Sequence, residues 1–369
     1  MKLGLLPALG LVLPTLLFAQ PADLDAQVEA IMEEYHVTGV GIGRIEESRL
    51  AWTRYYGEQS PGVAVSDSTM FNTASVNKAV TAELALRLVD EGLLDFDEPI
   101  SAHYVHPDIA ADSRHEYLTP RIILTHTTGF LNWPHNYEDG KLAFLRDPGE
   151  AYGYSGIGFM ILGRFLEHKL GTTFPELVRQ HVFEPAGMTY ASVVQAPWME
   201  PLVAHPSDAE GQPFPDFALD YGYWNPADDL YVSVPDYAKF LLHVLEGNTL
   251  SPALRVERQR VQTSLIEDDI WGCKEGRDMP CPDAFGHSIG WFVFDYGGNV
   301  NIQHGGNDQG EAGIGYLELS SNSGTIVFVR GANGVLAWPR IVDLIDGEQQ
   351  FTSVFHAIIA EYFSAQEEG

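Results

Sequence analysis

Two serines stand in patterns that could support covalent catalysis. Gly286-His287-Ser288-Ile289-Gly290 is a complete G-x-S-x-G, the pattern of a nucleophile elbow. Ser75-Val76-Asn77-Lys78 is the only S-x-x-K in a chain with just six lysines. Residues three apart lie on the same face of a helix, so the Lys78 amine can reach the Ser75 hydroxyl. Each pattern predicts a nucleophilic serine, and the neighbouring sequence must decide between them.

The residues around Ser288 do not fit an elbow. An elbow needs a strand before the serine and a helix after it, because the sharp turn exposes the hydroxyl. The segment 291–298 is instead typical of a strand that ends in a turn. An acid followed by a histidine should also lie downstream, where only His304 and His356 remain. We therefore interpret Ser288 as incidental.

The segment around Ser75 is predicted to be a buried helix, the setting that a catalytic serine and lysine pair requires. Val76, Val80, Leu84 and Leu88 recur at four-residue intervals, which predicts a buried helix that ends near Gly92. Burial can lower the pKa of a lysine from ~10.4 by the ~3 units that a base at neutral pH needs, at a cost of about 4 kcal/mol. The N–H groups of a helix N-terminus can also stabilise an oxyanion. A capping serine with a solvated lysine would fit an exposed helix better.

Hydrophobic periodicity predicts which elements hold this segment in place. Apolar residues at helical spacing predict helices over 22–35, 75–90, 159–169, 175–182, 234–245 and 352–362. Strand-like runs occur at 37–45, 50–56, 291–295, 314–319 and 325–330. The strands come from both ends of the chain and the helices mostly from the middle, so a helical block is expected inside an α/β frame.

Several motifs in a fixed order resemble the serine β-lactamase and penicillin-binding-protein superfamily, especially its class C-like esterases and D-peptidases. Residues 71–78 and 89–99 look like the nucleophile helix and the loop that follows it. Residues 123–130 (ILTHTTGF) are similar to the signature L-L-T-H-T-S-G-L, and 183–188 (FEPAGM) to F-x-P-L-G-M. Residues 285–291 (FGHSIGW) resemble a Gly-x-Gly-Trp segment of the family, which accounts for the G-x-S-x-G without a nucleophilic Ser288.

The resemblance covers nearly all of the chain beyond residue 19. It implies an α/β (α+β) fold, β-lactamase-like, in which an antiparallel sheet is flanked by helices and carries an inserted all-helical subdomain. We expect a single catalytic domain over 20–369. Its α/β subdomain would take about 20–74 and 246–369, and its helical subdomain about 75–245.

The resemblance also implies roles for a second motif, Tyr-x-Asn. Gly158, Leu162 and Gly163 match the residues that follow this motif and fix its tyrosine as Tyr154 rather than Tyr152. Tyr154 would exchange a proton with Ser75 and the leaving group, as phenolate or as hydrogen-bonded phenol. The asparagine is replaced by Gly156, and losing its contact with the substrate amide could cost amide substrates roughly 10–100-fold. This difference favours esters over β-lactams and peptides.

A third motif, Lys/His-Thr/Ser-Gly on the strand beside the pocket, is matched by His304-Gly305-Gly306. We expect His304 to hydrogen-bond a substrate carboxylate or ester oxygen, and the alternative is a partly buried structural histidine. Gly306 keeps the small residue that allows backbone and substrate to approach, and Gly305 replaces the hydroxyl residue. By analogy the backbone N–H of Asn307 would be the second oxyanion donor.

Composition limits the possible partners. The formal charge is −30, which disfavours nucleic acid and anionic membrane surfaces. Residues 1–19 carry one charge, Lys2, and an apolar run that ends in a small-residue cleavage context, so we expect a signal peptide and an exported protein, periplasmic or secreted. Pro7 and Pro14 interrupt this short run, which argues against a membrane anchor.

Three further pairs of residues have no settled role. Cys273 and Cys281 could form a disulfide in an exported protein or remain reduced. His103 and His106 form an H-x-x-H without an evident third ligand, so we expect loop histidines rather than a metal site. Asp228 and Asp229 stand where relatives tend to have Gly-Gly, without an assigned role.

Together these features predict an exported, cofactor-free serine hydrolase that forms an acyl-enzyme on Ser75 with Lys78 and Tyr154. Its substrate would be a small ester, amide or β-lactam, with a carboxylic ester favoured. The alternatives are a D-amino-acid peptidase or weak β-lactamase, and a non-catalytic, penicillin-binding-like relative that binds ligands without turnover. The intact Ser75, Lys78 and Tyr154 argue against the non-catalytic relative.

Overall fold

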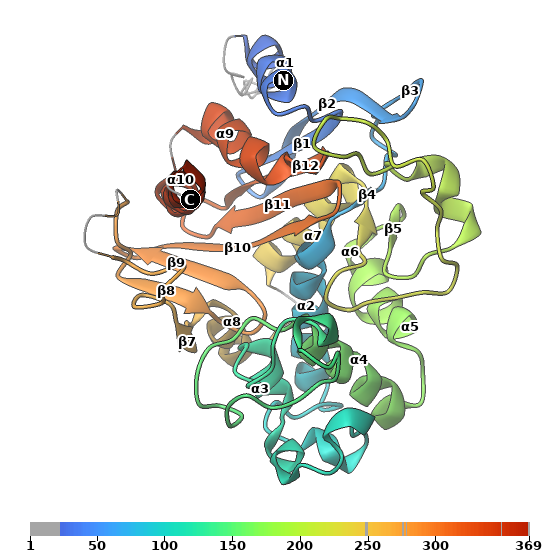
Figure 1. The fold of residues 1–369 in the computed structure, drawn as a ribbon, viewed down its shortest axis with the longest axis vertical. Helices are drawn as coiled ribbons and strands as arrows, with labels where there is room; N and C mark the ends of the chain where they lie inside the picture. The colour runs from blue at the N-terminus through green and yellow to red at the C-terminus, as the bar shows by residue number, and fades with distance from the viewer. Residues whose placement is uncertain (1–22, 248–249, 275–276, 278, 348, 368–369) are drawn as a thin grey trace, which may run out of the picture.

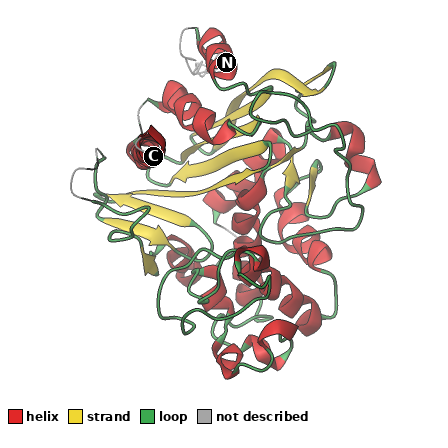
Figure 2. Cartoon of the chain, in the orientation of Figure 1, coloured by secondary structure: helices red, strands yellow, loops and turns green. Residues whose placement is uncertain are grey.

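A large antiparallel sheet forms the centre of the molecule. The computed structural model describes residues 23–369, except 248–249, 275–276, 278, 348 and 368–369, so the predicted signal peptide lies outside the described residues. The sheet has nine strands in the order β3-β2-β1-β12-β11-β10-β9-β8-β7 (Figures 1 and 2). The first and last strands in sequence lie side by side inside this sheet, where β1 pairs with β12. A second, small sheet has the order β4-β6-β5.

The strands are β1 (Gly39–Glu46), β2 (Arg49–Ser60), β3 (Val63–Ala64), β4 (Phe71–Asn72), β5 (Ala191–Ser192), β6 (Tyr231–Val232), β7 (Thr263–Ser264), β8 (Ala284–His287), β9 (Phe292–Tyr296), β10 (Asn299–Asp308), β11 (Glu311–Glu318) and β12 (Ser323–Arg330). The α-helices are α1 (Leu24–Glu34), α2 (Asn77–Asp90), α3 (Pro120–Leu124), α4 (Gly156–Leu170), α5 (Phe174–Val178), α6 (Glu184–Ala186), α7 (Val234–Glu246), α8 (Pro252–Gln259), α9 (Gly334–Asp346) and α10 (Gln350–Glu367). Single-turn helices include η1 (Ala74–Val76) and a π-helical turn, η6 (Arg179–Phe183).

Helices cover both faces of the large sheet. Apolar residues of α1, α9 and α10 form one cluster with residues from β1, β9, β11 and β12. A larger cluster on the opposite face joins α2, α4 and α7 to the sheet. Figure 1 shows α9 and α10 together on one side of β11, and α7 and α2 on the other. The fold is therefore the predicted mixture of an antiparallel sheet and flanking helices.

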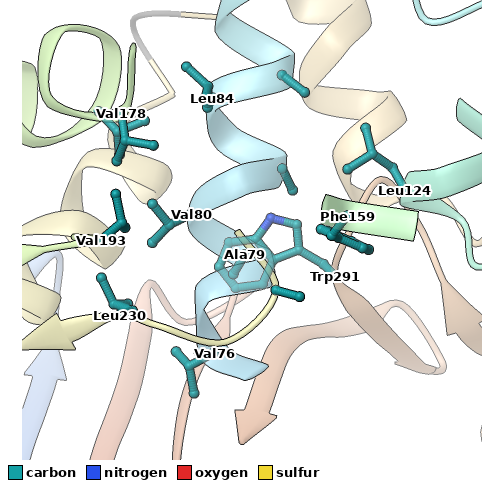
Figure 3. Close-up of a cluster of buried hydrophobic side chains, with 14 of the residues drawn as sticks. Val76, Ala79, Val80, Leu84, Leu124, Phe159, Val178, Val193, Leu230 and Trp291 are labelled. Carbon is teal, nitrogen blue, oxygen red and sulfur yellow. The ribbon is translucent and has the colours of Figure 1, made fainter. Parts of the chain in front are cut away.

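Helix α2 is the central packing element and also carries the S-x-x-K lysine. Twelve of its residues, Asn77 through Leu88, are buried. Figure 3 shows α2 surrounded by apolar side chains that come from distant segments, including Val178, Val193, Leu230, Leu124, Phe159 and Trp291. A helix enclosed on all sides has little freedom to move, so the residues at its N-terminus are held rigidly.

The observed elements match the predicted ones apart from a few differences. The helix predicted over 175–182 is α5 followed by the π turn η6. Helix α9, over 334–346, was not predicted from the sequence. Pro339 lies within it and obscures the periodicity of its apolar residues. Helix α7, from the middle of the chain, packs against β1, β2 and β12. The division into α/β and helical subdomains therefore stays a prediction.

Two further features of the chain concern its cysteines and the length of its apolar helices. Cys273 and Cys281 form a disulfide with a Cα–Cα distance of 5.8 Å, which answers the question that the sequence left open. Among the described residues, no helix is both long and apolar enough to cross a membrane.

Candidate active site

Ser75 lies where the small sheet meets the start of α2. Strand β4 ends at Asn72, and η1 then leads directly into α2. The backbone of Ala74 has a φ of 48°, a left-handed conformation that costs a non-glycine residue roughly 1 kcal/mol. Asn72 stabilises this turn, because its Oδ1 accepts a hydrogen bond from the Ala74 N–H at 3.2 Å. A strained turn held in this way is common beside a reactive side chain.

Lys78 is completely buried and bonded to Ser75. Its Nζ donates hydrogen bonds to Ser75 Oγ at 2.9 Å and to the Ala227 carbonyl at 2.8 Å. Burial lowers the pKa of Lys78 to about 7, although the nearby Asp228 carboxylate acts in the opposite direction. A large fraction of Lys78 is therefore neutral at neutral pH and able to accept a proton.

Tyr154 completes a group of three side chains around the Ser75 hydroxyl. Lys78 Nζ lies 4.7 Å from the centroid of the Tyr154 ring, which stacks on His126 with 4.4 Å between centroids. Burial raises the pKa of Tyr154 well above its ordinary value, while a hydrogen bond with Ser75 opposes this shift. Tyr154 is therefore a neutral phenol near pH 7, and of the two alternatives from the sequence this supports hydrogen-bonded phenol over phenolate.

The open edge of β10 forms the opposite wall of the site. Strand β9 pairs with β10 only as far as Gln303, so residues 304–308 have no strand neighbour on that side within the described part of the chain. His304, Gly305, Gly306 and Asn307 line a cavity of about 400 Å³ together with Ser75 and Tyr154. The structure thus brings these sequence-predicted site residues, with Lys78 just behind Ser75, into one place.

Gly306 is needed for this approach and Gly305 is not. A Cβ built on Gly306 would meet the Thr73 carbonyl and would lie 2.8 Å from the Ser75 nitrogen. A Cβ built on Gly305 would meet only the Gly313 carbonyl, at 3.6 Å. Strand β10 can therefore pass close to the backbone of Ser75 only because residue 306 has no side chain.

We expect Gly306→Ala to lower kcat/KM by at least ~100-fold, because the methyl group pushes β10 away from Ser75 and misplaces the oxyanion donors. Gly305→Ala is the matched control and should change kcat/KM less than about fivefold. Steady-state kinetics on one ester, with circular dichroism to check folding, would measure both. Equal losses in the two variants would contradict this account of the glycine pair.

Trp133 fills the space beside Gly156, a contact that was not predicted from the sequence. A Cβ at residue 156 would overlap the indole ring, with the Trp133 Cε2 at 2.9 Å and two ring atoms closer still. The Gly156 N–H donates to Asn132 Oδ1 at 2.7 Å, so the same loop that places the indole also caps α4. The position of the family's asparagine side chain is therefore occupied by a tryptophan from another segment.

This packing changes what a restored asparagine should do. Gly156→Asn alone should lower turnover of esters and amides alike, because the new side chain must displace Trp133. Gly156→Asn combined with Trp133→Ala should raise amide or β-lactam turnover relative to ester turnover by roughly 10-fold. Rate ratios on matched ester and amide substrates would test this, and an unchanged ratio in the double variant would contradict it.

Three buried histidines lie behind Tyr154, and two of them were not predicted as site residues. His126 and His287 have ring centroids 4.6 Å apart, and His304 lies near both. Burial lowers the pKa of each, to about 3 for His304, so all three are neutral. His304 Nδ1 bonds the Gly305 carbonyl at 2.8 Å, and its buried Nε2 has no hydrogen-bond partner among the described residues. The histidines form a neutral polar wall rather than a cationic pocket for a carboxylate.

The G-x-S-x-G segment places its histidine behind Tyr154 and its serine away from the cavity. Ser288 is fully buried, and its Oγ donates to the Arg258 carbonyl at 2.6 Å. His287, one residue earlier, lies within hydrogen-bonding distance of the Tyr152 hydroxyl at 3.4 Å. A buried hydroxyl held by a carbonyl cannot reach a substrate, which agrees with the interpretation of Ser288 as incidental.

Asp228 and Asp229 belong to a group of carboxylates beside Lys78. Asp228 directly follows Ala227, the residue whose carbonyl holds Lys78. Burial raises the pKa of Asp228 to about 6 and that of Asp229 to about 7; the neighbouring Asp308 acts in the same direction on both, and Lys78 opposes the shift of Asp228. The pKa of buried Glu311 is raised well above its ordinary value for the same reasons. Of these carboxylates, Asp228 acts directly on the pKa of Lys78.

Asp228→Asn should therefore shift the pH profile of activity. Asp228 raises the pKa of Lys78, so its removal should lower that pKa and leave more neutral lysine at acidic pH. We expect the acid limb of kcat/KM to move to lower pH by about one unit. Asp229→Asn is the control and should move it less. A shift to higher pH in Asp228→Asn would contradict the sign of this interaction.

His103 and His106 lie apart from this cavity. The His103 ring packs on Phe165, and His106 Nδ1 accepts a hydrogen bond from the Asp108 N–H at 3.3 Å. In the part of the chain that the structure describes, no three His, Cys, Asp or Glu side chains are grouped as a metal site.

Comparison with known proteins agrees with this fold. The Beta-lactamase family model matches residues 24–337. The chain therefore belongs to the Beta-lactamase family, whose members include serine hydrolases related to penicillin-binding proteins. It is 24% identical over 343 residues to "Penicillin-binding protein 4" of Amycolatopsis lactamdurans, with 88% of each chain covered. It also matches "Protein flp" of Staphylococcus aureus at 23% identity, over 47% of this chain and only 38% of that protein.

Solved structures show the same fold at low sequence identity. The octameric penicillin-binding protein homologue from Pyrococcus abyssi has a TM-score of 0.69 and 21% identity, covering 89% of this chain and 78% of that one. The D-alanine carboxypeptidase AmpC from Burkholderia cenocepacia has a TM-score of 0.67 and 19% identity, covering 86% and 97%. The β-lactamase-like fold predicted from the motifs is confirmed.

Proposed function

We propose that the protein is a serine hydrolase that forms an acyl-enzyme on Ser75 and acts on carboxylic esters. The observation that carries the proposal is the hydrogen bond between Ser75 and a completely buried Lys78 whose pKa is about 7. A lysine in this state is a base at neutral pH, and a serine bonded to it is an activated nucleophile.

In the acylation step, Ser75 Oγ attacks the ester carbonyl while its proton passes to Lys78 Nζ. The backbone N–H groups of Ser75 and Asn307 are the proposed donors to the oxyanion that forms. When the tetrahedral intermediate collapses, the C–O bond to the alcohol breaks and the alcohol oxygen takes up the proton from Lys78 by way of the Tyr154 hydroxyl. Proton transfer of this kind contributes ~10²–10⁴-fold in rate.

Deacylation reverses these roles with water as the nucleophile. As water attacks the acyl carbon, its proton passes to Lys78 by way of the Tyr154 hydroxyl, and Ser75 Oγ leaves with a proton returned from Lys78. The cycle consumes one water, releases one carboxylic acid and one alcohol, and is proposed to need no cofactor.

The preference for esters rests on Gly156 and Trp133. The asparagine expected at 156 would bind the amide of a β-lactam or peptide, and the indole now fills its place. An ester needs one fewer hydrogen bond at that position, so its turnover is less affected. Gly305 likewise provides no hydroxyl next to His304.

Peptidase or weak β-lactamase activity is the second candidate. It is favoured by the similarity to Penicillin-binding protein 4 and to a D-alanine carboxypeptidase.

We also propose, from residues 1–19, that the protein is exported, either to a periplasm or out of the cell.

A substrate panel tests the ester proposal. The mature protein would be assayed with p-nitrophenyl acetate, a chromogenic cephalosporin and a D-alanyl-D-alanine peptide. We expect kcat/KM for the ester to exceed that for the other two by at least ~100-fold. Faster turnover of the peptide or cephalosporin would overturn the ester assignment, and a stable acyl-enzyme that never deacylates would favour a non-catalytic binding protein.

A further inference from the structure

The cavity beside Ser75 extends well beyond the reacting groups into an apolar pocket. Its far wall is built by α9, α10 and the segment that precedes Cys273, with Trp271, Phe292, Trp338, Phe355 and Ile359 among the lining residues. No Asp, Glu, Lys or Arg occurs among the described residues that line it. At about 400 Å³ the cavity is within the size range of small-molecule sites.

The aromatic residues of this wall support one another. Trp271 packs on Phe292 and on Phe355, with ring centroids 5.4 and 5.8 Å apart, and Phe355 packs on Trp338 at 4.8 Å. Rings locked in mutual contact form a rigid apolar surface, which binds an apolar group with little loss of conformational freedom.

One polar side chain faces this surface without a partner. Gln303 lines the pocket and is fully buried, yet neither its amide nitrogen nor its amide oxygen has a hydrogen-bond partner among the described residues. Buried amides are nearly always paired, so an unpaired one beside a cavity indicates a position where a ligand supplies the missing partner. Gln303 immediately precedes His304 and so lies next to the edge of β10 that faces Ser75.

We infer that this pocket binds a bulky apolar substituent of the substrate, one that carries an amide or a similar donor and acceptor pair for Gln303. This inference rests on the proposed function. It narrows the proposed substrates to esters that carry both an N-acyl amide and an apolar aliphatic or aromatic group. The apolar part packs against Trp271, Trp338 and α10. Gln303 donates one hydrogen bond to the carbonyl oxygen of the substituent and accepts one from its N–H.

Chain length tests the apolar part of the inference. p-Nitrophenyl acetate and octanoate would be compared in wild-type protein, and we expect kcat/KM to be at least ~10-fold higher for octanoate. Ile359→Trp fills the pocket and should lower the octanoate-to-acetate ratio at least fivefold. Ala360→Trp places the same side chain at the adjacent exposed position of α10 and should leave the ratio unchanged. Equal ratios in the two variants would overturn the inference.

A substrate pair tests the role of Gln303. The p-nitrophenyl ester of N-acetylphenylalanine, in both enantiomers, would be compared with that of 3-phenylpropionate, which lacks the amide. Wild-type protein should prefer one N-acetyl ester by at least ~10-fold, and Gln303→Leu should abolish that preference. A preference that survives in Gln303→Leu would contradict the assigned contact.

Binding to the Ser75→Ala variant separates this inference from the proposed function. Octanamide and acetamide would be titrated calorimetrically, and we expect octanamide to bind at least ~10-fold more tightly and Ile359→Trp to remove the difference. Octanamide that binds no better than acetamide would overturn the pocket assignment, even if Ser75-dependent ester turnover is found. Tight octanamide binding without any ester turnover would instead overturn the hydrolase and leave the pocket standing.

Discussion

Replacing Ser75 with alanine is expected to abolish turnover of every ester, amide and β-lactam, with a loss in kcat of at least ~10⁴-fold. The alanine removes the only hydroxyl bonded to Lys78 among the described residues, so no acyl-enzyme can form. Steady-state kinetics with a chromogenic ester would measure the loss. Folding should be retained, because Ser75 contributes little to the core around α2.

Ser288→Ala is the matched control for this experiment. Ser288 is buried and bonded to the Arg258 carbonyl, so its removal should change kcat by less than about threefold while lowering stability slightly. Activity that persists in Ser75→Ala and disappears in Ser288→Ala would contradict the assignment and support the elbow pattern instead.

Lys78→Met should reduce activity about 10²–10⁴-fold and at the same time stabilise the protein. The pKa of Lys78 is about 7 in the folded chain and 10.5 in an ordinary setting, so between these values the unfolded chain binds the proton more strongly. The cost to folding is greatest below pH 7, falls as the pH rises, and is absent above pH 10.5. Methionine removes that cost.

We expect Lys78→Met to be more stable than the wild type by about 1–4 kcal/mol at pH 7, with the difference vanishing near pH 10. Urea denaturation at both pH values would measure it. Lys239→Met, at an exposed position of α7, is the control and should show neither the activity loss nor the pH-dependent gain. A Lys78→Met variant that is less stable than the wild type at pH 7 would contradict this account, because it would show that burying the Lys78 amine does not destabilise the folded chain.

The parts of the site that depend on local geometry could be predicted from the sequence. The i, i+3 spacing of Ser75 and Lys78 fixes their contact once α2 forms, and the apolar repeat within 76–88 shows that α2 is buried. The register of the second motif picks Tyr154 from two neighbouring tyrosines, and the structure places Tyr154 against both Lys78 and His126.

Contacts between distant segments could not be predicted. Trp133 lies 23 residues before Gly156, and nothing in either segment indicates that the indole fills the glycine's space. The unpaired amide of Gln303 depends on which side chains of α9 and α10 surround it. Within 286–290 the pattern points to Ser288, whereas the structure places the neighbouring His287 behind Tyr154.

Asp228 shows how tertiary environment gives a residue its effect. Two adjacent aspartates in a loop are ordinarily solvated, and sequence alone assigned them no role. The structure places Asp228 next to the residue that holds Lys78 and close to Asp308, so that its charge influences the base on which the proposed chemistry depends.

The identity of the acylated residue is the central claim, and one labelling experiment tests it most directly. The mature protein would be treated with a fluorophosphonate probe, and separately with a penicillin, and the modified peptide would be located by mass spectrometry. The fluorophosphonate should be found on Ser75, with penicillin labelling slow or absent because Trp133 occupies the place of the amide-binding asparagine. Label on Ser288, or none on Ser75, would contradict the proposed nucleophile.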